Sequence, residues 1–341
     1  VAGFAVGQLA KVQEAGLLDV QEAIAALPHI FVHKPRTHAK KAVEMLAKIA
    51  EEPSHRSQAV EAITTVTGNV HVKHVNRNVL TVLDVMGADV PVYPGADQPL
   101  VPGYWAAEAR IHGEDGLGGY PNRPATSRQL HDEPAAAALI RLASEAPGQY
   151  TLVALGPLTN IALACRLDPL FPDKIHKLVF MGGTISALGN TKNVTAEFNI
   201  YSDPEAAEIV LDAFAQSTML SWETTLKHPF SWEQYDALAA TNTPAGRFFR
   251  DTTITTVDYL RQFRQVRGYL LPDPLAMAIA LRPDLIGDSA LHFVRVELQG
   301  RATRGQTVID YMGLLEREPN VNVVTGLDTA GVYALYQQML A

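Results

Sequence analysis

Short apolar runs alternate with helix-forming segments along most of the chain, and this alternation limits the folds open to it. Residues 59–65, 90–93, 150–155 and 179–181 have the apolar character of buried strands, and segments with apolar residues at helical spacing follow them. Parallel strands need a long crossover, usually helical, whereas an antiparallel hairpin does not. The alternation therefore predicts an α/β fold with an open, mostly parallel sheet and helices on both faces.

The domain organisation follows from length and from the order of these segments. The chain has 341 residues, is 47% hydrophobic and shows no repeat or linker. We predict a single domain over residues 28–341, with a helical insertion at about 225–270. Residues 1–27 carry apolar positions at mixed helical spacing, which predicts a helical N-terminal extension.

Charge and cysteine content exclude several classes of protein. The formal net charge of -8 argues against a nucleic-acid partner. Cys165 is the single cysteine, so an intrachain disulfide is excluded and a reducing, cytoplasmic compartment is expected. No apolar run reaches the roughly 18 to 20 residues of a membrane-spanning helix, so we expect no membrane partner.

The polar loop after the predicted strand at 179–181 is the strongest sign of a binding site. Two glycines allow a sharp turn after the strand, and Asn190, Glu197 and Asn199 follow them. Ligands of open α/β sheets bind at the carboxyl ends of strands, where this loop would lie. Amides and a carboxylate suit a ligand with several hydroxyls, such as a sugar. An ordinary loop whose asparagines are only turn residues is the alternative.

Together with other loops, this stretch resembles the inosine-uridine-preferring nucleoside hydrolase family. The resemblance runs from about residue 29 to the C-terminus. Its segments are residues 63–69 (ITTVTGN), 92–97 (VYPGAD), 112–118 (HGEDGLG), 156–160 (GPLTN), 181–183 (MGG), 196–199 (AEFN) and 203–207 (DPEAA). It implies hydrolysis of the N-glycosidic bond of ribonucleosides by a calcium-activated water, in a homodimer or homotetramer.

The resemblance also implies roles for individual side chains at the ribose. Asn69 would lie close to the ribose and the attacking water. Asn190, Glu197 and Asn199 would hold ribose hydroxyls. His112 would face the nucleoside from a mobile loop, where it is a candidate proton donor to the leaving base.

Further residues would form the pocket wall and the metal site. The resemblance implies that Met181 and Phe198 line the sugar and base pocket. It makes Asp273 a calcium ligand through its carboxylate and Leu155 a ligand through its backbone carbonyl. Some family members carry a histidine just before this aspartate, but Pro272 occupies the position here.

The segment after the first predicted strand, His29 to Val32, departs from the family. The family pattern there is Asp-x-Asp-x-Gly-x-Asp-Asp-Ala, whereas residues 34–42 read KPRTHAKKA. By this alignment Arg36 takes the position of the catalytic base and Lys40 lies beside the ribose. The other two acids are replaced by Lys34, at the start of the motif, and by Lys41, at a calcium-ligand position.

These cations conflict with calcium-assisted hydrolysis. Each like-charge pair about 4 Å apart costs about 4 kcal/mol at an effective dielectric near 20, and arginine stays protonated, so it cannot act as a base. Either residues 34–41 differ from the natural sequence, or the chain is an inactive homologue with a sugar-binding or structural role, or the cations bind an anion such as a phosphorylated sugar. A solvated surface turn is the remaining alternative. We predict nucleoside hydrolysis, with the inactive homologue as the alternative.

Overall fold

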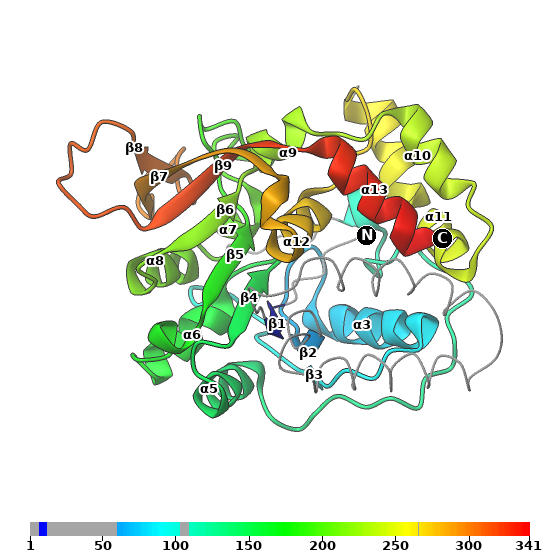
Figure 1. Cartoon of the computed structure of the whole chain (residues 1–341), viewed down its shortest axis with the longest axis horizontal. Coiled ribbons are helices and arrows are strands. Elements are labelled where there is room, and N and C mark those ends of the chain that lie inside the picture. Colours follow the sequence, from blue (N-terminus) through cyan, green and yellow to red (C-terminus); the bar gives the residue numbers. More distant parts are fainter. Residues whose placement is uncertain (1–6, 12–59, 103–108, 265) are drawn as a thin grey trace.

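The computed structural model describes residues 7–11, 60–102, 109–264 and 266–341. In these ranges the strands form one nine-stranded sheet in the order β3-β2-β1-β4-β5-β6-β9-β7-β8 (Figure 1). The strands are β1 (Gly7–Lys11), β2 (Val60–Thr64), β3 (Val92–Tyr93), β4 (Tyr150–Ala154), β5 (Lys177–Met181), β6 (Ser217–Leu220), β7 (Ile286–Val296), β8 (Thr307–Asp310) and β9 (Val321–Leu327).

The sheet is mostly parallel, as the sequence predicts. The pairs β2–β3, β4–β5, β5–β6 and β6–β9 are parallel. Antiparallel pairing is limited to β1, which lies between β2 and β4, and to β7, which lies between β9 and β8. The carboxyl ends of the central parallel strands therefore lie along one edge of the sheet, which is the place for a ligand in such folds.

Strand β1 corrects part of the prediction for the N-terminus. We expected helix over residues 1–27, but Gly7–Lys11 pairs with β2 on one side and β4 on the other. Hydrogen bonds along both edges of the segment outweigh a weak helical periodicity, because tertiary pairing overrides local propensity. The rest of 1–27, the predicted strand at 29–32 and the basic segment 34–41 lie outside the described residues, so the domain boundary stays a prediction.

Helices cover both faces of the sheet (Figure 1). They are α3 (Val72–Met86), α4 (Ala109–His112), α5 (Ala135–Glu145), α6 (Thr159–Leu167), α7 (Phe198–Ser202), α8 (Pro204–Ala213), α9 (Trp222–Lys227), α10 (Trp232–Ala239), α11 (Pro244–Tyr259), α12 (Pro272–Leu281) and α13 (Thr329–Leu340). Helices α9 to α11 and a π-helical turn at Leu260–Arg264 lie between β6 and α12. They form the helical insertion that the sequence predicts.

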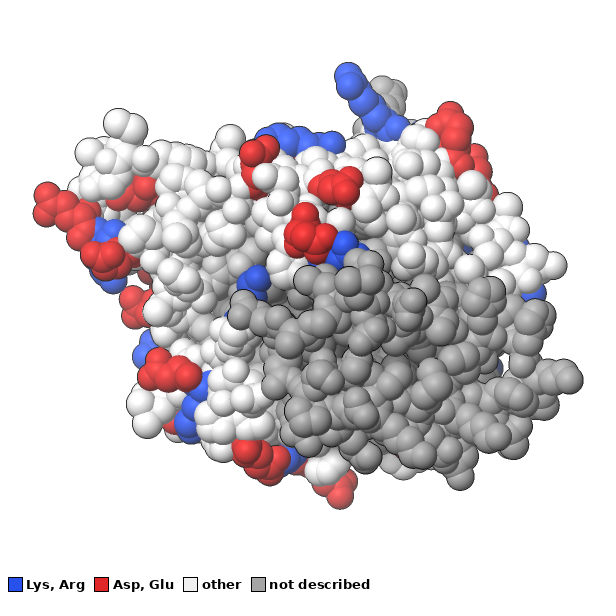
Figure 2. Space-filling model, in the orientation of Figure 1, with Lys and Arg blue, Asp and Glu red and all other residues white. Residues whose placement is uncertain are grey.

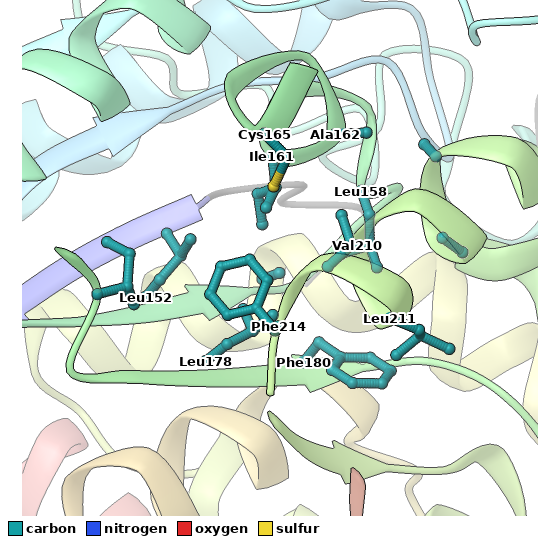
Figure 3. Packing of buried hydrophobic residues seen from close by; sticks show 14 of the residues in the cluster. Leu152, Leu158, Ile161, Ala162, Cys165, Leu178, Phe180, Val210, Leu211 and Phe214 are labelled. Carbon is teal, nitrogen blue, oxygen red and sulfur yellow. The ribbon is translucent and has the colours of Figure 1, made fainter. Parts of the chain in front are cut away.

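Alternate residues of the central strands point to opposite faces and so enter two different cores. Leu152, Leu178 and Phe180 belong to the cluster that includes side chains of α5, α6 and α8, among them Ile161 and Val210 (Figure 3). The side chains of these three strand residues are 0% exposed. Burial on this face explains why the strands read as continuous apolar runs.

The second core lies on the other face. Val153, Val179 and Met181 pack in a cluster with residues of α10 to α13, including Leu275 and Ile279 of α12. The first turn of α12 is thereby held against the strands that end at the candidate site. On the surface, Lys and Arg side chains are interspersed with Asp and Glu over the described part of the face in Figure 2.

A matched pair of leucines tests this arrangement. Leu178→Ala removes a side chain that is 0% exposed, whereas Leu170→Ala removes one that is 62% exposed. We expect the first change to lower the free energy of unfolding by about 2–5 kcal/mol through lost burial and a cavity, and the second by less than about 0.5 kcal/mol. Urea unfolding midpoints of the two variants measure this. Equal losses would contradict the assignment of β5 to the core.

Candidate functional site

The loops at the carboxyl ends of β2, β3 and β4 are joined by one buried amide, Asn160 of α6. Its Oδ1 accepts a hydrogen bond from the backbone N–H of Ala96 at 2.9 Å, and its Nδ2 donates to the carbonyl of Thr65 at 2.7 Å. Gly95 passes so close that an added Cβ would lie 1.8 Å from the Thr65 carbonyl oxygen, so only glycine fits there. A cavity of about 10 Å³ lies beside this junction and is lined by Leu155 among others.

Glu197 fixes the loop that follows β5. It is the N-cap of α7 and is 2% exposed. Its carboxylate accepts hydrogen bonds from the backbone N–H groups of Gly183 at 3.1 Å, Asn199 at 2.9 Å and Ile200 at 3.2 Å. Burial raises the pKa of Glu197 to about 7, although the backbone donors act in the opposite direction. The carboxylate is therefore close to its titration point at neutral pH.

Asn199 and Met181 lie together where β5 ends. The Nδ2 of Asn199 donates to the Met181 carbonyl at 3.1 Å and lies 3.4 Å from the Met181 sulfur. Both residues are buried. The first turn of α7 thus places the Asn199 amide beside the carboxyl end of a central strand, close to the Glu197 cap.

Asn190 carries a buried polar atom that lacks a partner. Its backbone N–H donates to the Ala196 carbonyl at 3.1 Å, which closes the loop, while its Oδ1 is buried and has no hydrogen-bond partner in the described part of the chain. An unpaired buried acceptor costs about 1–3 kcal/mol, so such an atom needs an explanation. A ligand hydroxyl would supply the missing hydrogen bond.

The Nδ1 atom of His112 is a second buried polar atom of this kind. It is buried and has no hydrogen-bond partner among the described residues. Burial lowers the pKa of His112 to about 3, so the ring is neutral at physiological pH. In this state the imidazole can form hydrogen bonds as a neutral group, and the role of His112 as proton donor to the leaving base stays a prediction.

Asp273 lies in the first turn of α12 and interacts electrostatically with Glu197. The side chain is partly buried. Burial raises its pKa to about 8, and the negative charge of Glu197 acts in the same direction. Glu197, the N-cap of α7, thus acts on the protonation of Asp273 in the first turn of α12, although the two carboxyls come from different elements.

The architecture and this set of residues agree with a known family. The family model described as inosine-uridine preferring nucleoside hydrolase matches residues 42–334. The chain belongs to this nucleoside hydrolase family. The matched range begins directly after the basic segment 34–41.

Named nucleoside hydrolases resemble the chain in sequence. It is 36% identical over 284 residues to the pyrimidine-specific ribonucleoside hydrolase of Citrobacter koseri, which covers 83% of this chain and 89% of that protein. It is also 36% identical over 249 residues to uridine nucleosidase 1 of Arabidopsis thaliana, which covers 73% of each. These similarities confirm the predicted family.

Solved structures of nucleoside hydrolases share the fold. An inosine-guanosine nucleoside hydrolase superposes with a TM-score of 0.78 at 32% identity, over 89% of this chain and 95% of that one. The purine-preferring ribonucleoside hydrolase from Gardnerella vaginalis gives 0.76 at 29% identity, over 87% and 94%. The predicted α/β fold is thereby confirmed.

Some of the remaining predicted site residues of this family member lie in the described part of the chain, and others do not. Asn69 is partly buried in the loop between β2 and α3, and Phe198 is partly buried as the first residue of α7. Leu155 is buried directly after β4. Arg36 and Lys40 lie outside the described residues, so their predicted places at the site stay predictions.

The described residues do not fit a calcium ion by themselves. Calcium takes six to eight oxygen ligands, usually with several carboxylates. No group of three or more His, Cys, Asp or Glu side chains suited to a metal is present in the described ranges. Asp273 and the Leu155 carbonyl are the donors predicted there, which leaves the set too small.

Two residues that position the site were not given a role by the sequence. Asn160 lies within the GPLTN segment, but its contacts to Ala96 and Thr65 join residues far apart in the chain. Glu223 lies shortly after β6, in the first turn of α9. It accepts backbone hydrogen bonds from the loop that carries Asn190. Such contacts have no local sequence signal.

None of the described helices is long and apolar enough to cross a membrane.

Asp273→Asn tests the electrostatics of the site. Because the pKa of Asp273 is about 8 in the folded state against 3.8 normally, the folded state binds more protons between these values, and stability falls as pH rises through this window. The amide does not titrate, so the melting temperature of the variant minus that of wild type should grow from pH 5 to pH 9. For a chain of 341 residues each kcal/mol corresponds to about 1–2 °C.

Thermal melts with a chelator present measure this difference. Asp132→Asn, at an exposed position, controls for the loss of one negative charge. The same pH trend in both variants would show that burial of Asp273 is not its cause.

Proposed function

We propose that this chain hydrolyses the N-glycosidic bond of ribonucleosides to ribose and free base. The observation that carries the proposal is the polar set that follows β5, formed by the buried Oδ1 of Asn190 and the buried residues Glu197 and Asn199. Asp273 of α12 is coupled electrostatically to Glu197 of this set. Membership of the nucleoside hydrolase family supports it. The two relatives named for pyrimidine or uridine substrates point to ribonucleosides as the substrate class.

The amides suit the ribose half of such a substrate. The unpaired Oδ1 of Asn190 accepts a hydrogen bond, and ribose hydroxyls donate one each. Binding then removes the penalty of leaving this buried acceptor unpaired. In our assignment Asn199 holds a further hydroxyl, Met181 and Phe198 line the sugar and base pocket, and Asn69 lies near the ribose.

The carboxyls suit the transition state. Breaking an N-glycosidic bond places positive charge on the ribose, and negative charges around it lower the barrier. Glu197 and Asp273 have pKa values of about 7 and 8 because of burial, so both hold protons part of the time at neutral pH. Developing positive charge beside them favours their ionised forms. The site is thus arranged to become more negative as the reaction proceeds.

A non-catalytic homologue is the second candidate, and a specific sequence feature favours it. The alignment puts Arg36 at the position of the catalytic base, and arginine cannot take up a proton. Lys34, Lys40 and Lys41 add positive charge in the same segment. Such a protein would keep the sugar pocket for binding or a structural role. The inactive homologue then binds ribose without hydrolysing nucleosides.

Ribose release from uridine and inosine distinguishes the two functions. We expect release by the wild type, and the assay is run with and without added calcium. Asn199→Ala should lower kcat/KM by about 100-fold or more, because it removes a hydrogen-bonding group from the ribose site. Asn242→Ala, at an exposed position, is the matched control and should leave kcat/KM unchanged.

Calorimetry with ribose completes this test. Ribose binding without hydrolysis would support the inactive homologue and contradict the proposed function. Loss of activity in Asn199→Ala counts only if its melting temperature stays near that of wild type, since Asn199 also bonds to Met181.

A further inference from the structure

Glu223 is a buried carboxylate that the proposed reaction does not use. It lies in the first turn of α9 and is 8% exposed. Its Oε2 accepts a hydrogen bond from the backbone N–H of Ile185 at 2.7 Å, and its Oε1 accepts from Ser186 at 2.8 Å and Leu188 at 3.1 Å. All these donors belong to the loop after β5. Helix α9 thereby binds the backbone of a loop from another part of the sequence.

The loop backbone is shaped to receive this carboxylate. Ala187, between the donors Ser186 and Leu188, has a φ of 59°. Left-handed backbone is strained for an alanine, but it turns neighbouring N–H groups toward one point and so forms a nest for an anion. Glu223 is the anion that occupies this nest. Its hydrogen bonds offset the strain at Ala187.

The nest is directly connected to Asn190. After Leu188, the N–H of Gly189 donates to the Val194 carbonyl at 2.8 Å, and that of Asn190 donates to the Ala196 carbonyl at 3.1 Å. The backbone between the nest and Asn190 therefore has little freedom. The Asn190 Oδ1, which has no hydrogen-bond partner in the described part of the chain, is thus carried by backbone that continues directly from residues 185–188.

The loop is also held at other points, which makes a local role for Glu223 testable. The N–H of Thr184 donates to Oγ1 of Thr307 at 2.7 Å, and Nδ2 of Asn193 donates to the carbonyl of Arg304 at 2.6 Å. These contacts do not involve α9. Removing the carboxylate should therefore release the backbone of residues 185–188 without unfolding the rest of the loop.

We propose that Glu223 is a positioning residue that places the Asn190 amide oxygen at the ribose. The proposal rests on the proposed function, since ribose is the group that Asn190 would bind. A carboxylate is needed because both of its oxygens accept. Glutamine would turn an NH₂ group toward at least one backbone N–H, and two donors cannot pair.

A double-mutant cycle tests this role. We expect Glu223→Gln to raise KM for uridine or inosine about 10-fold with a smaller change in kcat, because a ribose contact is made in both the ground state and the transition state. In an Asn190→Ala background the same change should have no further effect, because the amide through which Glu223 acts on the ribose has been removed. Glu318→Gln, at an exposed position, is the matched control.

Two outcomes of the cycle would overturn the proposal. If Glu223→Gln lowered kcat/KM by the same factor in both backgrounds, Glu223 would act on the fold in general and not through Asn190. Unchanged kinetics in Glu223→Gln would also overturn it. Should Glu223→Gln fail to fold, Ala187→Val disturbs the same nest from the loop side and replaces it in the cycle.

The proposed function and the positioning role fail in different ways. If the wild type releases no ribose, the proposed function fails, and the cycle is read from ribose affinity by calorimetry instead. Hydrogen exchange gives a readout that needs no activity: the amides of residues 185, 186 and 188 should exchange at least 10-fold faster in Glu223→Gln, with β5 unchanged. Absence of ribose binding, or exchange rates equal to wild type, would overturn the positioning role.

Discussion

The parallel pairing of β4, β5 and β6 is the constraint on which the candidate site depends. Because these strands run in the same direction, the loops that follow them come out at one edge of the sheet, although they are far apart in the sequence. Burial on both faces makes this pairing stable, since Leu178 and Val179 enter different cores. Stability and site are thus two results of the same arrangement.

At this edge of the sheet, the loops of the site are held together by buried carboxylates that accept hydrogen bonds from backbone N–H groups. Glu197 binds the turn after β5 to the start of α7, and Glu223 binds the next part of the same loop to α9. Asp203, the N-cap of α8, similarly accepts from the backbone N–H of Leu100, and it also accepts from the hydroxyl of Thr159. Each carboxylate replaces lost hydration by hydrogen bonds from the backbone, which also fixes the position of the chain.

Much of the fold could be predicted because its signals are local. The apolar runs of β2, β4 and β5 and the Asp203-Pro204 start of α8 need no knowledge of distant residues. Strand β1 could not be found this way, because its pairing with β2 and β4 decides its conformation. Helix α7 was missed because its N-cap is Glu197, whereas Ser, Thr, Asp and Asn are the usual signals.

In the site, too, local features could be predicted from the sequence, whereas features that depend on distant residues could not. Its loop residues stood out by type and order, and their family was confirmed. The contacts of Asn160 and Glu223, the pKa of Asp273 and the unpaired atom of Asn190 depend on burial and distant neighbours, which a sequence does not display.

The amide of Asn160 has a consequence for how such a chain can change over generations. It bonds at once to the loop after β2, through Thr65, and to the loop after β3, through Ala96. An insertion or deletion in one of these loops would pull on the other through a single side chain. The lengths of the two loops are therefore coupled, and they can drift only together or after Asn160 has been replaced.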